Sequence, residues 1–189
     1  MTGFEISEFR DTDLPSAVAR SIAQLACQSF TASRRTVEER VAGMEEMRGK
    51  TDLATRTGRR FVIWNGGQAI AHARVFVREI HADSGSLPVL ALASVCSDPE
   101  RRGQGLGAAV TRQAFDLVGR PTWPSVSLFQ TPVPEFYARL GCRPVDNRFV
   151  NRLNRQDPEA RPWRDEYVMI YPGEFAWPGG PIDLNGPDY

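Results

Sequence analysis

The chain has 189 residues, and its 23 Lys plus Arg residues balance its 23 Asp plus Glu residues. The length suits one globular domain over residues 1–189 with a continuous core. Proteins that bind nucleic acids or membrane surfaces usually carry a one-signed charge excess, which this chain lacks, so we expect neither partner.

The sequence also argues against membrane, disulfide-rich and metal-binding classes. No apolar run reaches the 18 residues of a membrane span, and the amino terminus has no signal-peptide pattern, so we expect a cytoplasmic protein. Cys27, Cys96 and Cys142 lie far apart without a Cys-x-x-Cys pair, and His72 and His81 are the only histidines. We therefore expect no disulfide framework and no metal site.

The first half of the chain predicts strands and two amphipathic helices. Alternation or helical spacing of apolar residues gives a strand at 4–10, helices at 16–30 and 36–47, and strands at 61–64 and 69–80. Asn65-Gly66-Gly67 predicts a hairpin turn in which Asn and Gly take the positive-φ positions. On the following strand, His72 falls on the polar face.

The second half continues the alternation of strands and helices. A nearly continuous apolar run at 87–96 predicts a central strand buried on both sides. After it we expect a helix at 106–118, a strand at 125–129, a helix from Pro132 to Leu140 with Thr131 as N-cap, and strands at 142–150 and 166–171. Residues 172–189 form a C-terminal tail, either an ordered strap or a loose end.

Three glycines at alternate positions mark the junction between the buried strand and the next helix. Gly103, Gly105 and Gly107 allow backbone N–H groups to converge without obstruction by Cβ atoms, and the helix dipole adds partial positive charge. Arg101 and Arg102 precede the turn and can donate to the same anion. This arrangement predicts a pyrophosphate site.

Two other phosphate-binding motifs fit less well. A P-loop requires a Gly-Lys pair, and the glycine turn contains no lysine. Gly103, Gly105 and Ala108 match the loose dinucleotide pattern G-x-G-x-x-G/A, but the acid expected after the next strand is replaced by Phe129 and Gln130. The dinucleotide-binding interpretation is therefore not favoured.

The turn resembles the R/Q-x-x-G-x-G/A signature of the GCN5-related N-acetyltransferase (GNAT) family, with Arg102, Gly105 and Gly107 at the signature positions. The resemblance implies an α/β (α+β) fold: a mixed, mostly antiparallel sheet of six to seven strands, flanked by about four helices and splayed between strands 4 and 5, where acetyl-CoA lies. It also implies that backbone groups of Val95, Cys96 and Ser97 contact the acetyl group and pantetheine arm. The implied pyrophosphate site consists of Arg102, Gly103, Gln104, Gly105, Leu106 and Gly107.

A second stretch, Phe136 to Cys142, resembles the FYxxxGF motif of the same family. Tyr137 falls on the position where many members use a tyrosine as general acid, and a phenol can protonate a departing thiolate. The alternative is that Tyr137 is an ordinary core aromatic. Cys142 replaces the usual aromatic, and we interpret it as a small buried hydrophobe.

The general base and the acceptor stay open at this point. Family members often place a glutamate on the fourth strand, where this chain has Ala93 and Ser94. The residues that could act as general base in place of this glutamate are Glu79, His81, Asp83, His72, Asp188 and the terminal Tyr189. Each of them is also explained as a solvated surface group. The chain is further similar to aminoglycoside 2'-N-acetyltransferases, for which Asp183 and Asp188 would help to hold a polycation.

We therefore expect an acetyl-CoA-dependent N-acetyltransferase that transfers the acetyl group directly to a primary amine of a small molecule. Direct transfer is favoured because no Cys-His or Ser-His arrangement is apparent. The alternatives are an aminoglycoside 2'-N-acetyltransferase-like enzyme and a catalytically weak acyl-CoA-binding regulatory module. The sequence leaves the oligomeric state open, a homodimer included.

Overall fold

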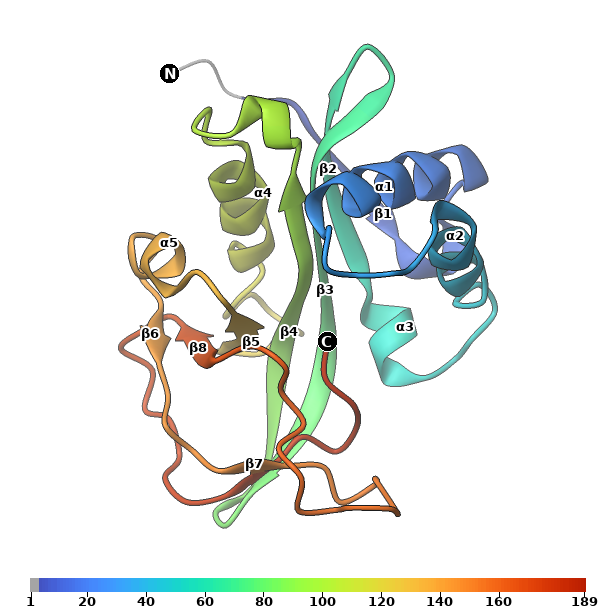
Figure 1. The fold of residues 1–189 in the computed structure, drawn as a ribbon. Helices are drawn as coiled ribbons and strands as arrows, with labels where there is room; N and C mark the ends of the chain where they lie inside the picture. Colours follow the sequence, from blue (N-terminus) through green and yellow to red (C-terminus); the bar gives the residue numbers. More distant parts are fainter. Residues whose placement is uncertain (1–3) are drawn as a thin grey trace. The chain divides into compact units, whose positions relative to one another are not determined.

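The computed structural model describes residues 4–189, which divide into two compact units (Figure 1). Unit 1 contains the chain up to Phe76 together with Ala93–Asp116, and unit 2 contains Val77–Leu92 and Leu117–Tyr189. Two long strands, β3 (Gln68–Ala82) and β4 (Gly85–Ser97), contribute residues to both. Residues 1–3 of the predicted domain lie outside the described part, and the domain boundaries stay a prediction.

Unit 1 combines the N-terminal strands with most of the helices. Its further elements are β1 (Ile6–Arg10), the 3-10 helix η1 (Asp11–Asp13), α1 (Ser16–Ser29), α2 (Val37–Glu45), α3 (Leu53–Thr57), β2 (Arg59–Asn65), the 3-10 helix η2 (Pro99–Arg101) and α4 (Leu106–Phe115). The strands and both predicted amphipathic helices are confirmed. α3 was not predicted, because five residues are too few to show a helical apolar period.

Local sequence signals explain how two of these elements begin and end. α2 starts at a capping box in which the Glu39 N–H donates to Thr36 Oγ1 (3.2 Å) and the Thr36 N–H donates to Glu39 Oε2 (2.7 Å). In the hairpin between β2 and β3, Gly66 (φ 54°) and Gly67 (φ 81°) form the turn, and Asn65 pairs with Gln68. The predicted turn residues were therefore wrong by one position.

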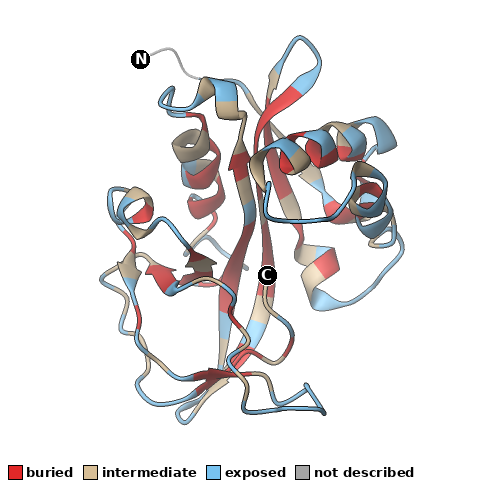
Figure 2. Cartoon of the chain, viewed as in Figure 1, coloured by how far each residue is buried: buried red, intermediate tan, exposed pale blue. Residues whose placement is uncertain are grey.

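The core of unit 1 lies between α1, α2 and the strands. β1 and β2 pair antiparallel, with Ile6 opposite Ile63, and β2 pairs antiparallel with β3. The buried residues of this cluster appear red in Figure 2 and include Leu14, Ala19, Ile22, Ala23, Leu25, Val41, Met44, Val62, Ala69 and Cys96. The apolar face of each helix thus supplies the packing that fixes the sheet.

Unit 2 is built mainly from short strands. They are β5 (Ser127–Thr131), β6 (Arg143–Pro144), β7 (Phe149–Val150), β8 (Tyr167–Tyr171) and β9 (Ile182–Asp183), with α5 (Pro134–Ala138) between β5 and β6. β5 runs parallel to β4 over two residue pairs, Leu90 with Ser127 and Ala91 with Leu128. β8 pairs antiparallel with β5 and β6, and β9 pairs with β3 and β7.

Two predicted elements of unit 2 differ from the structure. The strand expected at 142–150 is two short strands, because the intervening Asn147 side chain donates to the carbonyls of Pro178 and Gly180 in the tail. α5 begins at Pro134 and not at Pro132. Thr131 is the last residue of β5, where it pairs with Tyr167, and its Oγ1 accepts the Val133 N–H at 3.0 Å.

The tail over 172–189 is an ordered strap within unit 2. Ile182 and Leu184 are fully buried, and the Trp177 indole donates to Asn147 Oδ1 at 2.7 Å. In the described part of the chain the strands form a nine-stranded sheet, larger than the predicted six to seven strands, in which β7 and β9 join the path β1-β2-β3-β4-β5-β8-β6 through β3. The β1–β2, β2–β3, β3–β9, β5–β8 and β6–β8 pairs are antiparallel, and the β4–β5 and β7–β9 pairs are parallel. This largely antiparallel open sheet with few helices confirms the predicted fold class. Within residues 4–189 no helix is both long and apolar enough to cross a bilayer.

Candidate functional site

Near its C-terminal end, β4 changes from buried residues to a residue that is exposed and has an irregular backbone. Val89 to Ala93 are buried, and then Ser94 adopts a left-handed backbone (φ 53°) with an exposed side chain. Cys96 returns to the core, where burial raises the pKa of its thiol to about 12. The Ser97 carbonyl accepts a hydrogen bond from Ser29 Oγ at 3.0 Å. A thiol that stays protonated is a poor nucleophile, so backbone groups are what this segment offers to a ligand.

The predicted glycine turn follows directly and depends on two left-handed residues. Gly103 has φ 78° and Gly105 has φ 80°, and at both positions the space where a Cβ would lie has no protein atom within 4 Å. Gly105 is the N-cap of α4, and Gly107 is the second residue of that helix. The prediction that these glycines turn the chain into a helix is confirmed.

The start of α4 is open to an anion. Gly105 has no side chain that caps the helix, and the Ala109 N–H makes a helix hydrogen bond to the Gly105 carbonyl at 2.9 Å. The N–H groups of Leu106, Gly107 and Ala108 come before that bond, where a helix leaves its donors unsatisfied. A helix start with such donors is a favourable place for an anion.

The two arginines before the turn are placed differently. Arg102 is exposed, whereas Arg101 Nε lies 3.4 Å from Asp98 Oδ2. The Asp98 carboxylate also accepts the Glu100 N–H at 2.9 Å. Arg101 is thus engaged within the turn, and Arg102 is the better placed of the two to donate to a bound phosphate.

Tyr137 lies on α5 in unit 2 and is buried to 6% exposure. Its ring centroid is 4.6 Å from that of Phe129 and 4.8 Å from that of Phe136. The Tyr137 carbonyl accepts the N–H groups of Leu140 and Cys142, which closes the turn after α5. Burial raises the pKa of Cys142 to about 12, in keeping with a small buried hydrophobe. The geometry fixes the Tyr137 ring, and its role as general acid stays a prediction.

His72 does not lie on a polar surface, and that prediction was wrong. Its side chain is buried to 1% exposure, its Nδ1 is 3.0 Å from the Ser94 carbonyl oxygen, and its Nε2 is 3.4 Å from an Arg60 nitrogen. Since a carbonyl only accepts and a guanidinium only donates, the proton lies on Nδ1. Burial, together with the charge of Arg60, lowers the pKa of His72 to about 3. A neutral ring with both nitrogens engaged is not a general base.

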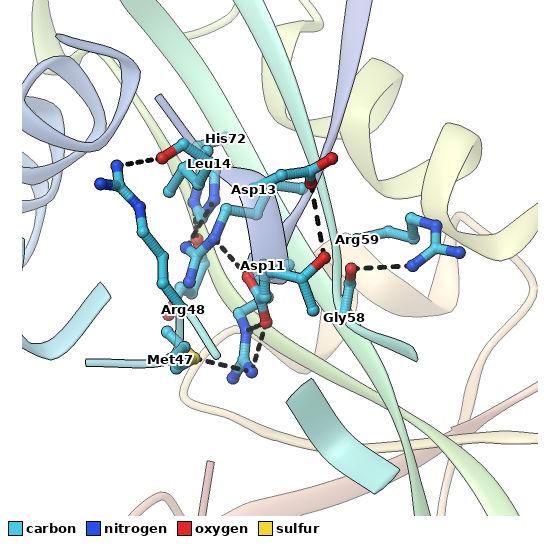
Figure 3. A network of polar contacts seen from close by, with 12 residues as sticks. Asp11, Asp13, Leu14, Met47, Arg48, Gly58, Arg59 and His72 are labelled. Atoms are coloured by element: carbon cyan, nitrogen blue, oxygen red, sulfur yellow. Dashed lines mark hydrogen bonds and ion pairs between the residues drawn. The ribbon is translucent and has the colours of Figure 1, made fainter. Parts of the chain in front are cut away.

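Asp11 anchors this region from η1 (Figure 3). Its carboxylate is fully buried and lies 2.6 Å from Arg60 Nε and 2.6 Å from an Arg74 nitrogen. Gly58 packs so closely that a Cβ there would lie 2.0 Å from Asp11 Oδ2. No pattern in the sequence signals this ion-pair network, because Asp11 and Arg60 are 49 residues apart.

A family model described as an acetyltransferase (GNAT) domain matches residues 13–145. The chain belongs to the GNAT family. A search of curated protein sequences finds no match.

Solved structures of GNAT proteins share the fold at low sequence identity. The GNAT family N-acetyltransferase YhbS of Escherichia coli, in complex with CoA, superposes with a TM-score of 0.62 at 16% identity, covering 98% of this chain and 92% of that one. A GNAT acetyltransferase of Brucella melitensis in complex with acetyl-CoA gives 0.60 at 14% identity and covers 97% of each chain. This chain spans only 33% of the length of similar structures from Enterococcus faecalis and Kribbella flavida.

The remaining candidates for the base of a GNAT reaction are no better placed. Glu79 and Asp83 are exposed, and His81 Nδ1 is 3.0 Å from Ser86 Oγ.

No group of three or more metal-binding side chains occurs in the part of the chain that the structure describes.

The carboxylates of the tail are engaged within unit 2. Asp183 is buried and accepts the N–H groups of Arg152 (3.1 Å) and Asn185 (3.0 Å). Asp188 accepts from Arg164 Nε at 2.5 Å. The Tyr189 hydroxyl donates to the Leu128 carbonyl at 3.0 Å, and burial raises its pKa. Each aspartate thus uses one carboxylate oxygen, Oδ1 of Asp183 and Oδ2 of Asp188, for contacts within unit 2.

The burial of neutral His72 makes the stability of this GNAT domain depend on pH. In the unfolded chain the ring takes up a proton below its ordinary pKa of about 6.5, whereas the folded protein resists until about pH 3. Stability is therefore lost as the pH falls through 6.5, by about 2 kcal/mol between pH 7 and pH 5 from this residue. Urea unfolding of wild type and His72→Asn at both pH values measures it. The difference in free energy of unfolding between wild type and His72→Asn should decrease by that amount from pH 7 to pH 5. An equal pH dependence of the two proteins would contradict the prediction.

Proposed function

We propose that the chain is an acetyl-CoA-dependent N-acetyltransferase that transfers the acetyl group directly to a primary amine of a small molecule. The observation that carries the proposal is the uncapped start of α4 beyond Gly103 and Gly105, with Arg102 exposed beside it. These features suit a pyrophosphate. The family to which the chain belongs supports acyl transfer from CoA.

In this proposal the cofactor contacts divide between two segments of unit 1. Backbone groups of Val95, Cys96 and Ser97 contact the acetyl group and the pantetheine arm. The pyrophosphate is held by Arg102, Gly103, Gln104, Gly105, Leu106 and Gly107. Tyr137 protonates the sulfur of the departing thiolate. Direct transfer is favoured because burial keeps the thiols of Cys96 and Cys142 protonated and non-nucleophilic.

An acyl-CoA-binding regulatory module is the second candidate. It is favoured by one observation: Ala93 and Ser94 offer no carboxylate on β4, and His72 is not available as a base. An aminoglycoside 2'-N-acetyltransferase-like activity has less support, since Asp183 and Asp188 already bind the Arg152 N–H and the Arg164 side chain within unit 2. In the enzyme, a water relay would deprotonate the acceptor amine, whose ordinary pKa is near 10.

One experiment separates these candidates. The protein is incubated with acetyl-CoA and a panel of aminoglycosides, polyamines, amino acids and peptide amino termini while free CoA thiol is measured, and its melting temperature is recorded with CoA alone. Thiol release with at least one amine supports the enzyme. Stabilisation by CoA without thiol release supports the binding module, and no stabilisation by CoA contradicts both.

Arg102→Ala should weaken CoA binding about 10- to 150-fold, since a charge-assisted hydrogen bond to phosphate is worth about 1.5–3 kcal/mol. Arg112→Ala is the matched control, because Arg112 is an exposed arginine in the last turn of α4, at the end of the helix opposite the turn that contains Arg102. Isothermal titration with CoA and with pantetheine, which lacks the pyrophosphate, measures the effect. Equal affinity of both variants for CoA would remove Arg102 from the pyrophosphate site.

A further inference from the structure

A chain of buried polar contacts connects η1 to the left-handed residue of β4. Asp11 binds Arg60 Nε at 2.6 Å, an Arg60 nitrogen lies 3.4 Å from His72 Nε2, and His72 Nδ1 lies 3.0 Å from the Ser94 carbonyl oxygen. The side chains of Asp11 and Arg60 are 0% and 4% exposed, and Figure 3 shows contacts of this network. All of these residues belong to unit 1.

We propose that His72 is a positioning residue for acyl transfer: it holds the Ser94 carbonyl and thereby aims the Val95 N–H toward the acetyl carbonyl oxygen. The inference rests on the proposed function, in which the backbone of Val95 contacts the acetyl group. It adds a residue of β3 that does not itself touch the substrate.

The geometry of one peptide unit carries the first step. The Ser94 carbonyl and the Val95 N–H belong to the same planar peptide, and in a trans peptide they point in opposite directions. Because the carbonyl points to His72 Nδ1, the Val95 N–H points away from the buried network. An N–H held in that direction can stabilise the negative charge that develops on a carbonyl oxygen during acyl transfer.

The backbone of Ser94 needs such a contact. Its φ of 53° lies in the left-handed region, which is unfavourable for a residue with a Cβ and persists where surrounding contacts enforce it. The side chain of Ser94 is exposed and its carbonyl is the group that enters the buried network. The hydrogen bond from His72 Nδ1 to the Ser94 carbonyl therefore holds this peptide in place.

Histidine suits the position because it donates on one side and accepts on the other. Arg60 donates to Nε2, which leaves the proton on Nδ1, and Asp11 fixes Arg60 in turn. Burial of the ring, helped by the nearby charges of Arg60 and Arg74, lowers the pKa of His72 and keeps it neutral. A neutral ring with a fixed proton gives a constant hydrogen-bond direction, which is what positioning requires.

Two substitutions separate this role from simple packing. His72→Leu fills the space without a donor, and His72→Asn keeps an N–H donor near the position of Nδ1. Removal of an oxyanion donor lowers kcat about 100- to 1,000-fold, and His72→Leu displaces the Val95 N–H without removing it. We therefore expect a smaller loss of kcat, about 10- to 100-fold, with the Kd for CoA changed less than about twofold. His72→Asn should recover kcat to within about fivefold of wild type. Equal losses in both variants, or a Kd that worsens as much as kcat, would overturn the proposal.

NMR gives a readout that does not depend on turnover or on the acceptor. Imidazole ¹⁵N shifts of the wild-type protein should show the Nδ1–H tautomer at pH 7, and an Nε2–H or charged ring would overturn the proposal. The Val95 amide proton should shift further with acetyl-CoA than with CoA, and this acetyl-dependent difference should be absent in His72→Leu.

The same measurements distinguish failure of this inference from failure of the proposed function. If wild type acetylates no amine on the panel but the acetyl-dependent Val95 shift is present and requires His72, the enzyme assignment fails and the positioning of Val95 by His72 stands. If wild type is active and His72→Leu retains full kcat and the Val95 shift, the inference fails and the function stands.

Discussion

Asp11→Asn should lower the free energy of unfolding by about 3–5 kcal/mol, the cost of removing one partner from a buried ion pair. The Asp11 carboxylate is 0% exposed and lies 2.6 Å from both Arg60 and Arg74. Burial lowers the pKa of Arg60 to about 10, and the charge of Asp11 opposes that effect. Without the carboxylate, Arg60 stays charged at neutral pH in a site with no counter-ion, and much of the cost comes from that charge.

Asp13→Asn is the matched control for this prediction. Asp13 lies in the same 3-10 helix and is exposed, so the same loss of charge should change stability by less than about 0.5 kcal/mol. Urea unfolding at pH 7, followed by circular dichroism, measures both variants. A loss for Asp11→Asn as small as that for Asp13→Asn would show that the pair contributes little.

Tyr137→Phe should lower kcat at least about 100-fold while changing the Kd for CoA less than about twofold, because general acid catalysis contributes about 10²–10⁴ to a rate. The substitution keeps the ring that packs against Phe129 and Phe136 at 4.6 and 4.8 Å between centroids. The fold of unit 2 should therefore be retained, and the loss should appear in the chemical step.

Tyr167→Phe controls for loss of a phenol from the same unit. Tyr167 is 38% exposed at the start of β8, and its variant should keep wild-type kcat. Steady-state thiol release with the best amine of the panel, together with the pH dependence of kcat, measures both. An unchanged kcat for Tyr137→Phe would leave Tyr137 as a core aromatic.

Sequence patterns predicted the parts of the fold that depend on local spacing. The apolar period located α1 and α2, and the glycines at 103 and 105 marked the left-handed turn before α4. Such signals are local, because each depends on the backbone preference or the periodicity of neighbouring residues. The fold class was predicted from the resemblance of the glycine turn to the GNAT signature and not from these local signals alone.

Features that depend on distant contacts could not be predicted in this way. His72 follows the alternation of a polar strand face, yet it is buried because Arg60 and the Ser94 carbonyl satisfy both ring nitrogens. The strand expected at 142–150 is broken because Asn147 binds carbonyls about 30 residues later in the chain. In each case a side chain found partners far away in the sequence.

Gly58 shows how one buried charge constrains the rest of the chain. Its φ of −57° and ψ of 126° suit any amino acid, so the requirement for glycine comes only from the Asp11 carboxylate 2.0 Å from where a Cβ would lie. Substitutions at positions 11 and 58 therefore depend on each other, because a side chain at 58 requires a smaller group at 11. A smaller, uncharged group at 11 in turn deprives the arginines at 60 and 74 of their counter-ion. Engineering of this domain therefore has to treat these four positions together, because a change at any one of them alters what the other three can be.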